Sequence, residues 1–258
     1  MAEAVEALRL RANPLSQRPF LGSSKKINHI KALQAGLAAQ PLPCLKVEGG
    51  ALAVMKRLLM LVLLLNSILL IQACGRPVPE EDPCHFVVNQ KGQRVSWGGQ
   101  TIRMFVHDSV PAIYRDAIRE AADVWNDKLG ERVLEVSIGA TGPVAPTRDG
   151  YSTINYLDTW EENKSNEQAR TTVYWTGSQV YEADIRINNK NFDFYVGDEE
   201  PDFSKVHMKS LMVHEFGHVL GLGHIEEKSS VMYPTLLNGL VRTDLSFVDL
   251  SSVRCEYN

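Results

Sequence analysis

Three histidines and a glutamate within eleven residues constrain this chain more than any other feature of its sequence. His214 and His218 are four residues apart, so on a helix both side chains leave the same face, one turn apart. Gly221 allows the chain to leave the helix in a left-handed conformation, which returns His224 to the first two. Three protein ligands leave one position of a zinc ion open for water, as a catalytic site requires. Glu215 lies beside a ligand and is placed to take a proton from that water.

The full pattern HExxHxxGxxH resembles the signature of the metzincin clan of zinc endopeptidases. After His224 come Val231, Met232, Tyr233 and Pro234, which resemble the Met-turn that lies beneath the zinc in these enzymes. HEFGHVLGLGH followed by VMYP is most similar to the matrixin family within that clan. The resemblance implies one catalytic zinc and a Met-turn at Met232. It also implies that Tyr233 and Pro234 form the wall of the pocket for the side chain after the cut.

The end of the chain also resembles the matrixins, whose last helix begins with Leu-Ser and carries an Asp and then a Tyr. Here Leu245 and Ser246 lead to Asp249 and Tyr257. The resemblance implies that Asp249 forms hydrogen bonds under the Met-turn and holds it in place. Val248 is a departure, because matrixins often have an acid there that pairs with a freshly cut N-terminus. We therefore expect no such activation clamp.

A second, structural zinc is not expected. Outside the motif the sequence has four histidines, no two of them close together: His29, His85, His107 and His207. One acidic run precedes the zinc motif: Asp198, Glu199, Glu200 and Asp202. We interpret this run as a solvated loop. A Ca²⁺ site is the alternative, and nothing else in the sequence supports it.

The segment before Cys74 has the composition of an export signal. Lys56 and Arg57 precede an apolar run over residues 58–71, and Ala73 stands before the cysteine. A short basic segment, an apolar run and a small residue are typical of a secretory signal. The run is too short for a membrane-spanning helix, which needs about 20 residues. Ile-Gln-Ala-Cys also resembles a bacterial lipobox, which implies that Cys74 is lipidated and becomes the mature N-terminus.

This interpretation divides the chain into four parts. Residues 1–54 are an over-extended start or a disordered leader, and residues 55–73 are the lipoprotein signal peptide. Residues 74–83 form a tether, and residues 84–258 form the catalytic domain. We expect a lipid-anchored protein of the bacterial cell envelope, sorted to the outer membrane because Gly75 rather than Asp follows the cysteine. It would face the periplasm or the cell surface.

A rival interpretation of Cys74 is a cysteine switch, in which a thiolate occupies the open zinc position of a latent enzyme. The sequence before Cys74 is an apolar signal core rather than a folded propeptide. A lipidated sulfur is a thioether and would not act as that ligand. We therefore favour lipidation.

Charge and cysteine usage agree with export. Nine of the 27 Lys and Arg residues and three of the 31 Asp and Glu residues precede Gly75, so residues 75–258 carry a net charge of −10. An acidic surface disfavours nucleic acid. Cys84 and Cys255 remain near the two ends of the mature domain. Exported domains permit a disulfide between them, with two buried free thiols as the alternative.

The hydrophobic pattern predicts an α+β fold, a twisted mixed β-sheet with helices packed behind it. The metzincin resemblance implies that this is a zincin-like catalytic domain with an active-site helix, a Met-turn and a C-terminal helix. Strands are predicted at residues 101–107, 133–138, 171–175 and 181–188. Residues 181–188 are a candidate for the edge that receives the substrate, although the sequence does not decide it. A helix capped by Ser109 should end at Gly130 and bury four positions: Ile113, Ala117, Ala121 and Val124. The zinc helix should span residues 204–220, and Ser246 with Asp249 should form a capping box on the last helix.

Two classes of function fit these features. The first is a membrane-anchored zinc endopeptidase that acts on proteins or peptides, with Glu215 as general base. The second is a zinc-containing envelope lipoprotein that binds without turnover. Glu215 favours the enzyme, because a non-catalytic protein has no need of that carboxylate. The loop of residues 235–243 should shape the floor of the substrate pocket. Its apolar residues indicate either a preference for apolar substrate side chains or, equally, a role in core packing: Leu236, Leu237, Leu240 and Val241. We expect a monomer, since no heptad or repeat is present.

Overall fold

The computed structural model describes residues 5–11, 56, 59–60, 82–144, 147–197 and 200–257. The chain divides into two compact units, one of Met1–Arg18 with Pro79–Asn258 and one of Pro19–Val78. In the second unit the described residues are Lys56, Leu59 and Met60, all helical. Cys74 and most of the predicted signal peptide and tether lie outside the described residues. Among the residues that are described, no helix is long and apolar enough to cross a membrane.

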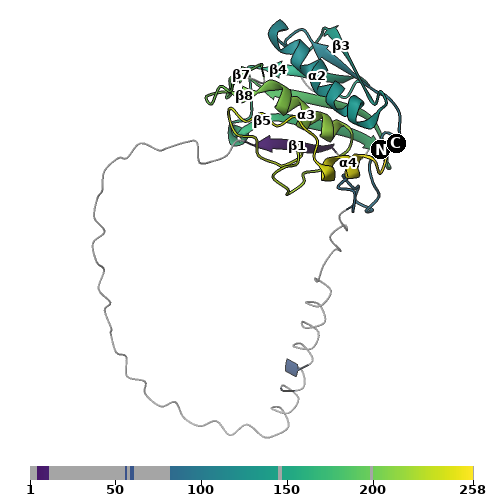
Figure 1. The fold of residues 1–258 in the computed structure, drawn as a ribbon. Coiled ribbons are helices and arrows are strands. Elements are labelled where there is room, and N and C mark those ends of the chain that lie inside the picture. The colour runs from purple at the N-terminus through teal and green to yellow at the C-terminus, as the bar shows by residue number, and fades with distance from the viewer. Residues whose placement is uncertain are drawn as a thin grey trace, which may run out of the picture. The chain divides into compact units, whose positions relative to one another are not determined.

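A six-stranded mixed sheet forms the centre of the first unit (Figure 1). Its strands are β1 (Val5–Arg11), β2 (Ile102–His107), β3 (Leu134–Ala140), β4 (Ser152–Leu157), β5 (Glu167–Thr176) and β6 (Gln179–Asn188). They lie in the order β1-β5-β6-β4-β2-β3. The neighbours among β3, β2, β4 and β6 are parallel, whereas β5 is antiparallel to both β6 and β1. Two short strands, β7 (Phe194–Tyr195) and β8 (Val206–His207), form a separate parallel pair.

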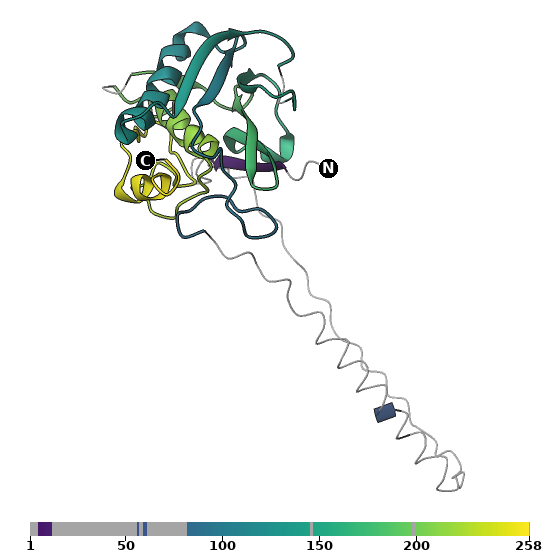
Figure 2. The same ribbon diagram turned by 90° about the vertical axis from the view of Figure 1, so that its right-hand side faces the viewer.

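Two long helices, α2 (Ala112–Leu129) and α3 (Met208–Val219), lie side by side on one face of this sheet (Figures 1 and 2). A single 3-10 turn, η2 (Glu162–Lys164), precedes β5, and a short helix, α4 (Phe247–Val253), lies near the end of the chain. The mixed sheet with packed helices confirms the predicted α+β fold. The capping box at the start of α4 is present, with Ser246 and Asp249 each accepting from the other's backbone N–H.

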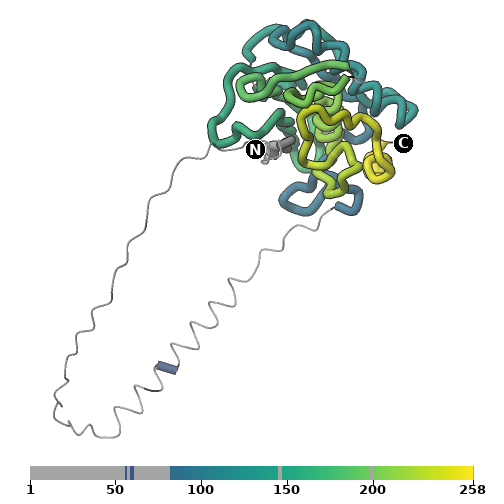
Figure 3. Tube along the Cα trace, turned by 60° about the vertical axis from the view of Figure 1, so that its left-hand side comes forward, coloured from purple at the N-terminus to yellow at the C-terminus, as the bar shows by residue number. Residues whose placement is uncertain are grey.

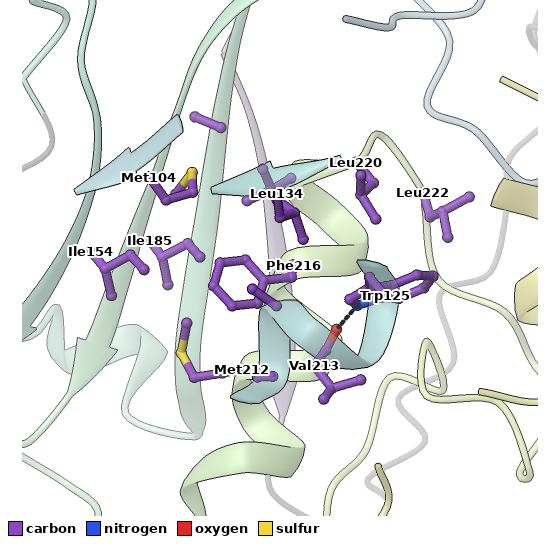
Figure 4. Packing of buried hydrophobic residues seen from close by; sticks show 14 of the residues in the cluster. Met104, Trp125, Leu134, Ile154, Ile185, Met212, Val213, Phe216, Leu220 and Leu222 are labelled. Carbon is purple, nitrogen blue, oxygen red and sulfur yellow. Dashed lines mark hydrogen bonds between the residues drawn. The ribbon is translucent and has the colours of Figure 1, made fainter. Parts of the chain in front are cut away.

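The core lies between α2, α3 and the sheet, where Trp125 joins the two helices (Figure 4). Trp125 is fully buried on α2, and its indole Nε1 donates to the Val213 carbonyl of α3 over 2.9 Å. Phe216 of α3 packs in the same cluster, beside Ile185 of β6. This packing fixes α3 against the sheet, which positions the side chains on its other faces.

The start of α2 differs from the sequence prediction in two respects: the role of Ser109 and the burial of Ile113. The Ser109 hydroxyl does not cap the helix; it accepts from the Tyr156 N–H of β4, and Pro111 is the N-cap residue. Ile113 is 65 % exposed rather than buried, because the buried stripe begins one turn later at Ala117. The predicted end at Gly130 is confirmed, since this residue has the left-handed φ of 75° that suits glycine.

Two predictions about strands were also wrong. The sequence analysis missed β4, which is too short and mixed in polarity to show a clear alternation. It also considered residues 181–188 as the substrate edge, whereas β6 lies inside the sheet between β5 and β4. Among the strands that follow Asp82 in the sequence, β5 is the antiparallel strand at the edge of the sheet.

The leader contains a strand that the sequence analysis did not anticipate. Val5–Arg11 forms β1 and pairs antiparallel with β5. The structure describes these residues as a strand, whereas the assignment of residues 1–54 to an over-extended start or a disordered leader stays a prediction. The alternation of Leu8, Arg9, Leu10 and Arg11 was present in the sequence but is too short to stand out within 54 residues otherwise read as structureless.

The two ends of the domain are joined at one place. The structure pairs Cys84 with Cys255 in a disulfide, across a sequence separation of 171 residues. His85 Nδ1 and the Ser252 hydroxyl are 2.9 Å apart in the same region. The blue segment after Asp82 and the yellow C-terminal segment accordingly run next to each other (Figure 3). Such a link stabilises the fold chiefly by restricting the unfolded chain.

Asp184 on β6 makes the stability of the fold depend on pH. It is fully buried, and its Oδ1 accepts from the backbone N–H and the hydroxyl of Thr153, both within 2.9 Å. Burial, assisted by the negative charges of Glu182 and Asp149, raises the pKa of this carboxyl to about 7, although the hydrogen bonds from Thr153 act in the opposite direction. The unfolded value is about 3.9, so the folded chain binds more protons between pH 4 and 7. Its free energy of unfolding therefore falls as the pH rises through this window.

We predict that Asp184→Asn removes this fall in the free energy of unfolding at higher pH. The amide oxygen still accepts from Thr153, and no charge needs to be buried. Relative to the wild type, the variant should gain on the order of 2–4 kcal/mol in unfolding free energy between pH 4 and pH 8. Urea unfolding of both proteins at several pH values measures this difference. A constant difference across the range would show that Asp184 does not carry the pH dependence.

Candidate metal centre

Helix α3 presents two of the three predicted ligands. His214 and His218 are four residues apart on α3 and both are fully buried. The helix ends at Val219, and Gly221 follows with a φ of 107°, a value that glycine adopts readily. This turn brings His224, which is half-buried, beside the other two. The ring centroids of the three imidazoles lie 4.5 to 5.4 Å apart.

Backbone carbonyls orient the two helical imidazoles. His214 Nδ1 lies 2.7 Å from the Val231 carbonyl oxygen, and His218 Nδ1 lies 2.8 Å from that of Leu222. A carbonyl oxygen only accepts, so each Nδ1 carries the proton and each Nε2 keeps a free lone pair. This arrangement is the one that histidine ligands of metal ions commonly show.

The free nitrogens fit a zinc ion. Nε2 of His214 and Nε2 of His218 are buried and have no hydrogen-bond partner among the described residues. One ligand atom from each of the three histidines lies within 4.8 Å of the other two. Zinc binds imidazole nitrogen at about 2.0–2.1 Å, and three such bonds leave a further position for water or substrate. The donor set therefore suits a catalytic zinc ion.

Burial keeps these imidazoles neutral. It lowers the pKa of His214 and of His218 well below the usual value, and the neighbouring histidines lower both further. Only the neutral form has the lone pair that a metal ion needs. The chain therefore holds two of its ligands ready at neutral pH without having to remove a proton.

The Met-turn lies directly against α3. Met232 is fully buried, and a Cβ added at Gly217 would overlap its sulfur atom. Gly217 lies between the two helical ligands, so the missing side chain allows the turn to approach the helix beneath them. The sequence pattern HEFGH contains this glycine, but nothing in it indicates why a larger residue is excluded there.

Asp249 of α4 holds the Met-turn in place, as the matrixin resemblance implied. Its Oδ1 accepts from the Ser230 hydroxyl, and its Oδ2 accepts from the Val231 N–H at 3.0 Å. The same carboxylate also accepts from the backbone and the hydroxyl of Ser246. Since the Val231 carbonyl accepts from His214, a single chain of hydrogen bonds joins α4 to the metal ligand.

Glu215 is buried beside the ligands and held by a residue of the sheet. The Thr171 hydroxyl of β5 donates to Glu215 Oε2 over 2.5 Å. The other oxygen, Oε1, has no hydrogen-bond partner among the described residues. Thr171 is a residue of the candidate site that the sequence analysis did not identify. Its 44-residue separation from Glu215 leaves no local signal.

Burial raises the pKa of the Glu215 carboxyl to about 8, while the Thr171 hydroxyl lowers it. A cation held by the three imidazoles would lower it further, because an opposite charge nearby favours the ionised form. The environment thus provides a carboxyl that can both accept and return a proton near neutral pH.

A hollow of about 340 Å³ lies next to Tyr233. It is lined by Lys228, Tyr233, Thr235, Leu237, Leu240 and Arg242. Pro234 is not among these residues, and Leu236 is buried in the core. Of the four apolar residues of the loop, Leu237 and Leu240 therefore line the hollow, whereas Leu236 packs in the hydrophobic core.

Two cations change the expected apolar character of this hollow. The Arg242 guanidinium donates to the carbonyls of Thr235 and Tyr233 and stacks over the Tyr233 ring, with 5.9 Å between its carbon and the ring centroid. Lys228 also lines the hollow and is an exposed residue. The sequence analysis considered only the apolar residues of this loop and overlooked both.

Among the described residues, the triad is the one group of three or more potential ligands whose donor atoms lie within 4.8 Å of one another. His85 bonds with Ser252, and His107 bonds with the N–H of Ser109. In the acidic run, Asp202 forms an ion pair with Lys205 at 3.0 Å, whereas Asp198 and Glu199 lie outside the described residues.

Comparison with known proteins points to the same family as the site. A family model described as Matrixin matches residues 100–258. Metalloendoproteinase 4-MMP of Arabidopsis thaliana is 43 % identical over 60 residues, which cover 23 % of this chain and 18 % of that protein. Metalloendoproteinase 2-MMP of the same plant is 42 % identical over 52 residues, 20 % of this chain and 14 % of its own length. The chain thus spans less than a fifth of these relatives.

We predict that His218→Asn abolishes high-affinity zinc binding, because two imidazoles remain and the shorter asparagine amide does not take the place of the third ligand nitrogen. The matched control is His85→Asn, outside the triad, at a position whose φ of 59° asparagine tolerates. Zinc per chain after dialysis, measured by mass spectrometry of the metal, should be close to one for the wild type and control. It should be close to zero for His218→Asn, and equal occupancy in all three would exclude this site.

Proposed function

Because the chain belongs to the matrixin family, we propose that it is a zinc-dependent endopeptidase that hydrolyses peptide bonds in proteins or peptides. The observation that carries this proposal is the convergence of free Nε2 atoms from His214 and His218 beside a buried carboxylate with one free oxygen. A structural zinc site needs no such carboxylate, whereas a hydrolytic site needs a proton acceptor next to the attacking water.

The three histidines would hold the zinc, and when bound it would supply a Lewis acid that polarises the scissile carbonyl and acidifies water. Glu215 Oε1 would accept a proton from the attacking water as its oxygen bonds to the carbonyl carbon. The same carboxyl would then return this proton to the leaving nitrogen as the C–N bond breaks. Thr171 would keep Oε2 fixed, so that the free Oε1 faces the reaction.

The proposal extends to a membrane anchor. The basic residues, apolar run and lipobox-like ending before Cys74 support a lipid on that cysteine. The Cys84–Cys255 disulfide supports an oxidising compartment, and the acidic charge of residues 75–258 agrees with an exported surface. We infer a location in the bacterial cell envelope, at the outer membrane. We also infer a monomer that acts on proteins or peptides and binds no nucleic acid.

We predict that Glu215→Gln keeps the zinc and lowers kcat/KM for peptide cleavage by about 10²–10⁴-fold. Glutamine has nearly the same shape but accepts no proton. The matched control is Glu226→Gln at an exposed position just after the motif, which should leave both properties unchanged. Metal content and cleavage of a diverse peptide library, with and without chelator, are the measurements. Zinc with no cleavage by the wild type would favour the non-catalytic binding lipoprotein instead.

We predict that expression in a diderm bacterium yields a mature N-terminus at Cys74 that carries acyl chains. Mass spectrometry of the N-terminal peptide and detergent partitioning should detect the lipid in the wild type. Cys74→Ser should abolish it, whereas the control Cys44→Ser should not, because residue 44 precedes the signal. A mature N-terminus at any other residue would contradict the anchor.

A further inference from the structure

The hollow beside Tyr233 carries positive charge in a domain whose net charge is negative. Two of its lining residues, Lys228 and Arg242, are cations, and none of the lining residues is an acid. Residues 75–258 as a whole carry a net charge of −10. Neither cation forms an ion pair with any residue that the structure describes. The hollow therefore holds two positive charges without a partner of opposite charge in this part of the chain.

Both sides of the hollow are attached to the metal helix close to His214. Tyr233 lies two residues after Val231, whose carbonyl oxygen is 2.7 Å from His214 Nδ1. On the other side, the backbone N–H of Arg242 donates to the Ser210 hydroxyl over 2.7 Å. Ser210 lies one turn before His214 on α3. The hollow is therefore held beside the part of α3 that carries the first metal ligand.

The loop orients the guanidinium of Arg242. Nη1 donates to the Thr235 carbonyl over 3.1 Å, and Nη2 donates to the Tyr233 carbonyl over 3.0 Å. A guanidinium has five N–H donors, so these two bonds leave three for another partner. Because carbonyl oxygens are neutral, they orient the cation without cancelling its charge. A guanidinium held in this way suits a carboxylate, which accepts two parallel hydrogen bonds from it.

The charge of Asp249 acts on Arg242, but this carboxylate is engaged elsewhere. Burial lowers the pKa of the Arg242 guanidinium, and the charge of Asp249 acts in the opposite direction. The two Asp249 oxygens accept from Ser230, Val231 and Ser246. Since an arginine side chain keeps its charge in proteins, the guanidinium is a permanent cation at the wall of the hollow.

The size and the other residues of the hollow suit a single side chain with an apolar stem. Its volume of about 340 Å³ is at the lower end of the range of ligand pockets, roughly 300–1,000 Å³. Leu237 and Leu240 are 45 % and 38 % exposed and offer contacts to methylene groups. Lys228 is exposed, and its flexible stem allows the ammonium group to approach an anion. A short apolar stem with a negative end matches these surroundings.

We propose that this hollow selects substrates with a glutamate or aspartate close to the scissile bond, and that Arg242 and Lys228 determine this specificity; this rests on the proposed endopeptidase function. The substrate carboxylate accepts from the guanidinium and pairs with the ammonium group. An apolar side chain contacts the two leucines but leaves both cations without a partner, and a basic side chain is repelled. Selectivity thus comes from charge, which the apolar residues of the loop do not indicate.

Cleavage of matched peptides by the full, zinc-loaded chain tests this proposal. Starting from one peptide that the protein cleaves, glutamate, glutamine, leucine or lysine is placed in turn at each position near the scissile bond, on both sides. Glutamine has nearly the shape of glutamate without its charge, so the ratio of kcat/KM for these two peptides isolates the charge. At one position we expect a ratio on the order of tenfold in favour of glutamate, which decreases as salt is added.

The same ratio, measured in variants, attributes the preference to the two cations. Arg242→Gln and Lys228→Gln should each lower it towards one. Because the ratio compares two peptides on one protein, a general loss of activity through a changed loop cancels. The matched control is Lys91→Gln, at an exposed lysine that does not line the hollow, and it should keep the wild-type ratio.

Three results would overturn the proposal. The first is the absence of a preference for glutamate at every position. The second is a leucine peptide that is cleaved faster than the glutamate peptide at the position of greatest preference, since the hollow would then select by apolar contact. The third is a preference for glutamate that neither Arg242→Gln nor Lys228→Gln reduces.

Peptide binding separates this proposal from the endopeptidase function. Glu215→Gln, which should prevent turnover, is mixed with labelled peptides that differ in one glutamate or glutamine. Fluorescence anisotropy should give a Kd on the order of tenfold lower for the glutamate peptide, and adding Arg242→Gln should remove this difference. Equal Kd values, or no binding of either peptide, would overturn the specificity even in an active enzyme. If no peptide is cleaved, the endopeptidase proposal fails, while the Kd values still decide whether the hollow binds an acidic side chain.

Discussion

The hydrogen bond between His214 Nδ1 and the Val231 carbonyl is the contact on which the rest of the site depends. It fixes the ring on α3 and at the same time attaches the Met-turn to that helix. The turn is also held by Asp249, whose carboxylate accepts from the N–H of the same residue, Val231. An imidazole on one helix and a carboxylate on another are thereby connected through the backbone of a single residue, Val231. Movement of either helix would change the orientation of the ligand.

Burial has a double role around this contact. It lowers the pKa of the two helical imidazoles and raises that of Glu215, because a buried site disfavours the charged form of each. The site thus places two neutral imidazoles beside a carboxyl whose pKa is raised by burial. The close approach of Met232 at Gly217 and the packing of Trp125 beneath α3 supply the rigid base that such burial requires.

The sequence predicted those parts of the molecule whose geometry is local. The spacing of His214 and His218, the left-handed residue at Gly130 and the capping box at Ser246 all depend on helix geometry within a few residues. Predictions failed where distant partners decide the outcome. Ser109 did not cap α2 because its hydroxyl is used by β4. Ile113 satisfied the helical period but lies beyond the edge of the surface that α2 covers.

By itself, the sequence predicted the three histidines of the metal site and the glutamate beside them. Four residues of helix place the imidazoles of His214 and His218 on one face whatever surrounds them. Only the tertiary structure decided which strand forms the edge, that Thr171 holds Glu215, and that Cys84 meets Cys255. It also decided that a strand from the first residues lies against β5. Each of these pairs residues tens of positions or more apart. Such contacts depend on how whole helices and strands pack, and the local periodicity of the sequence does not predict that packing.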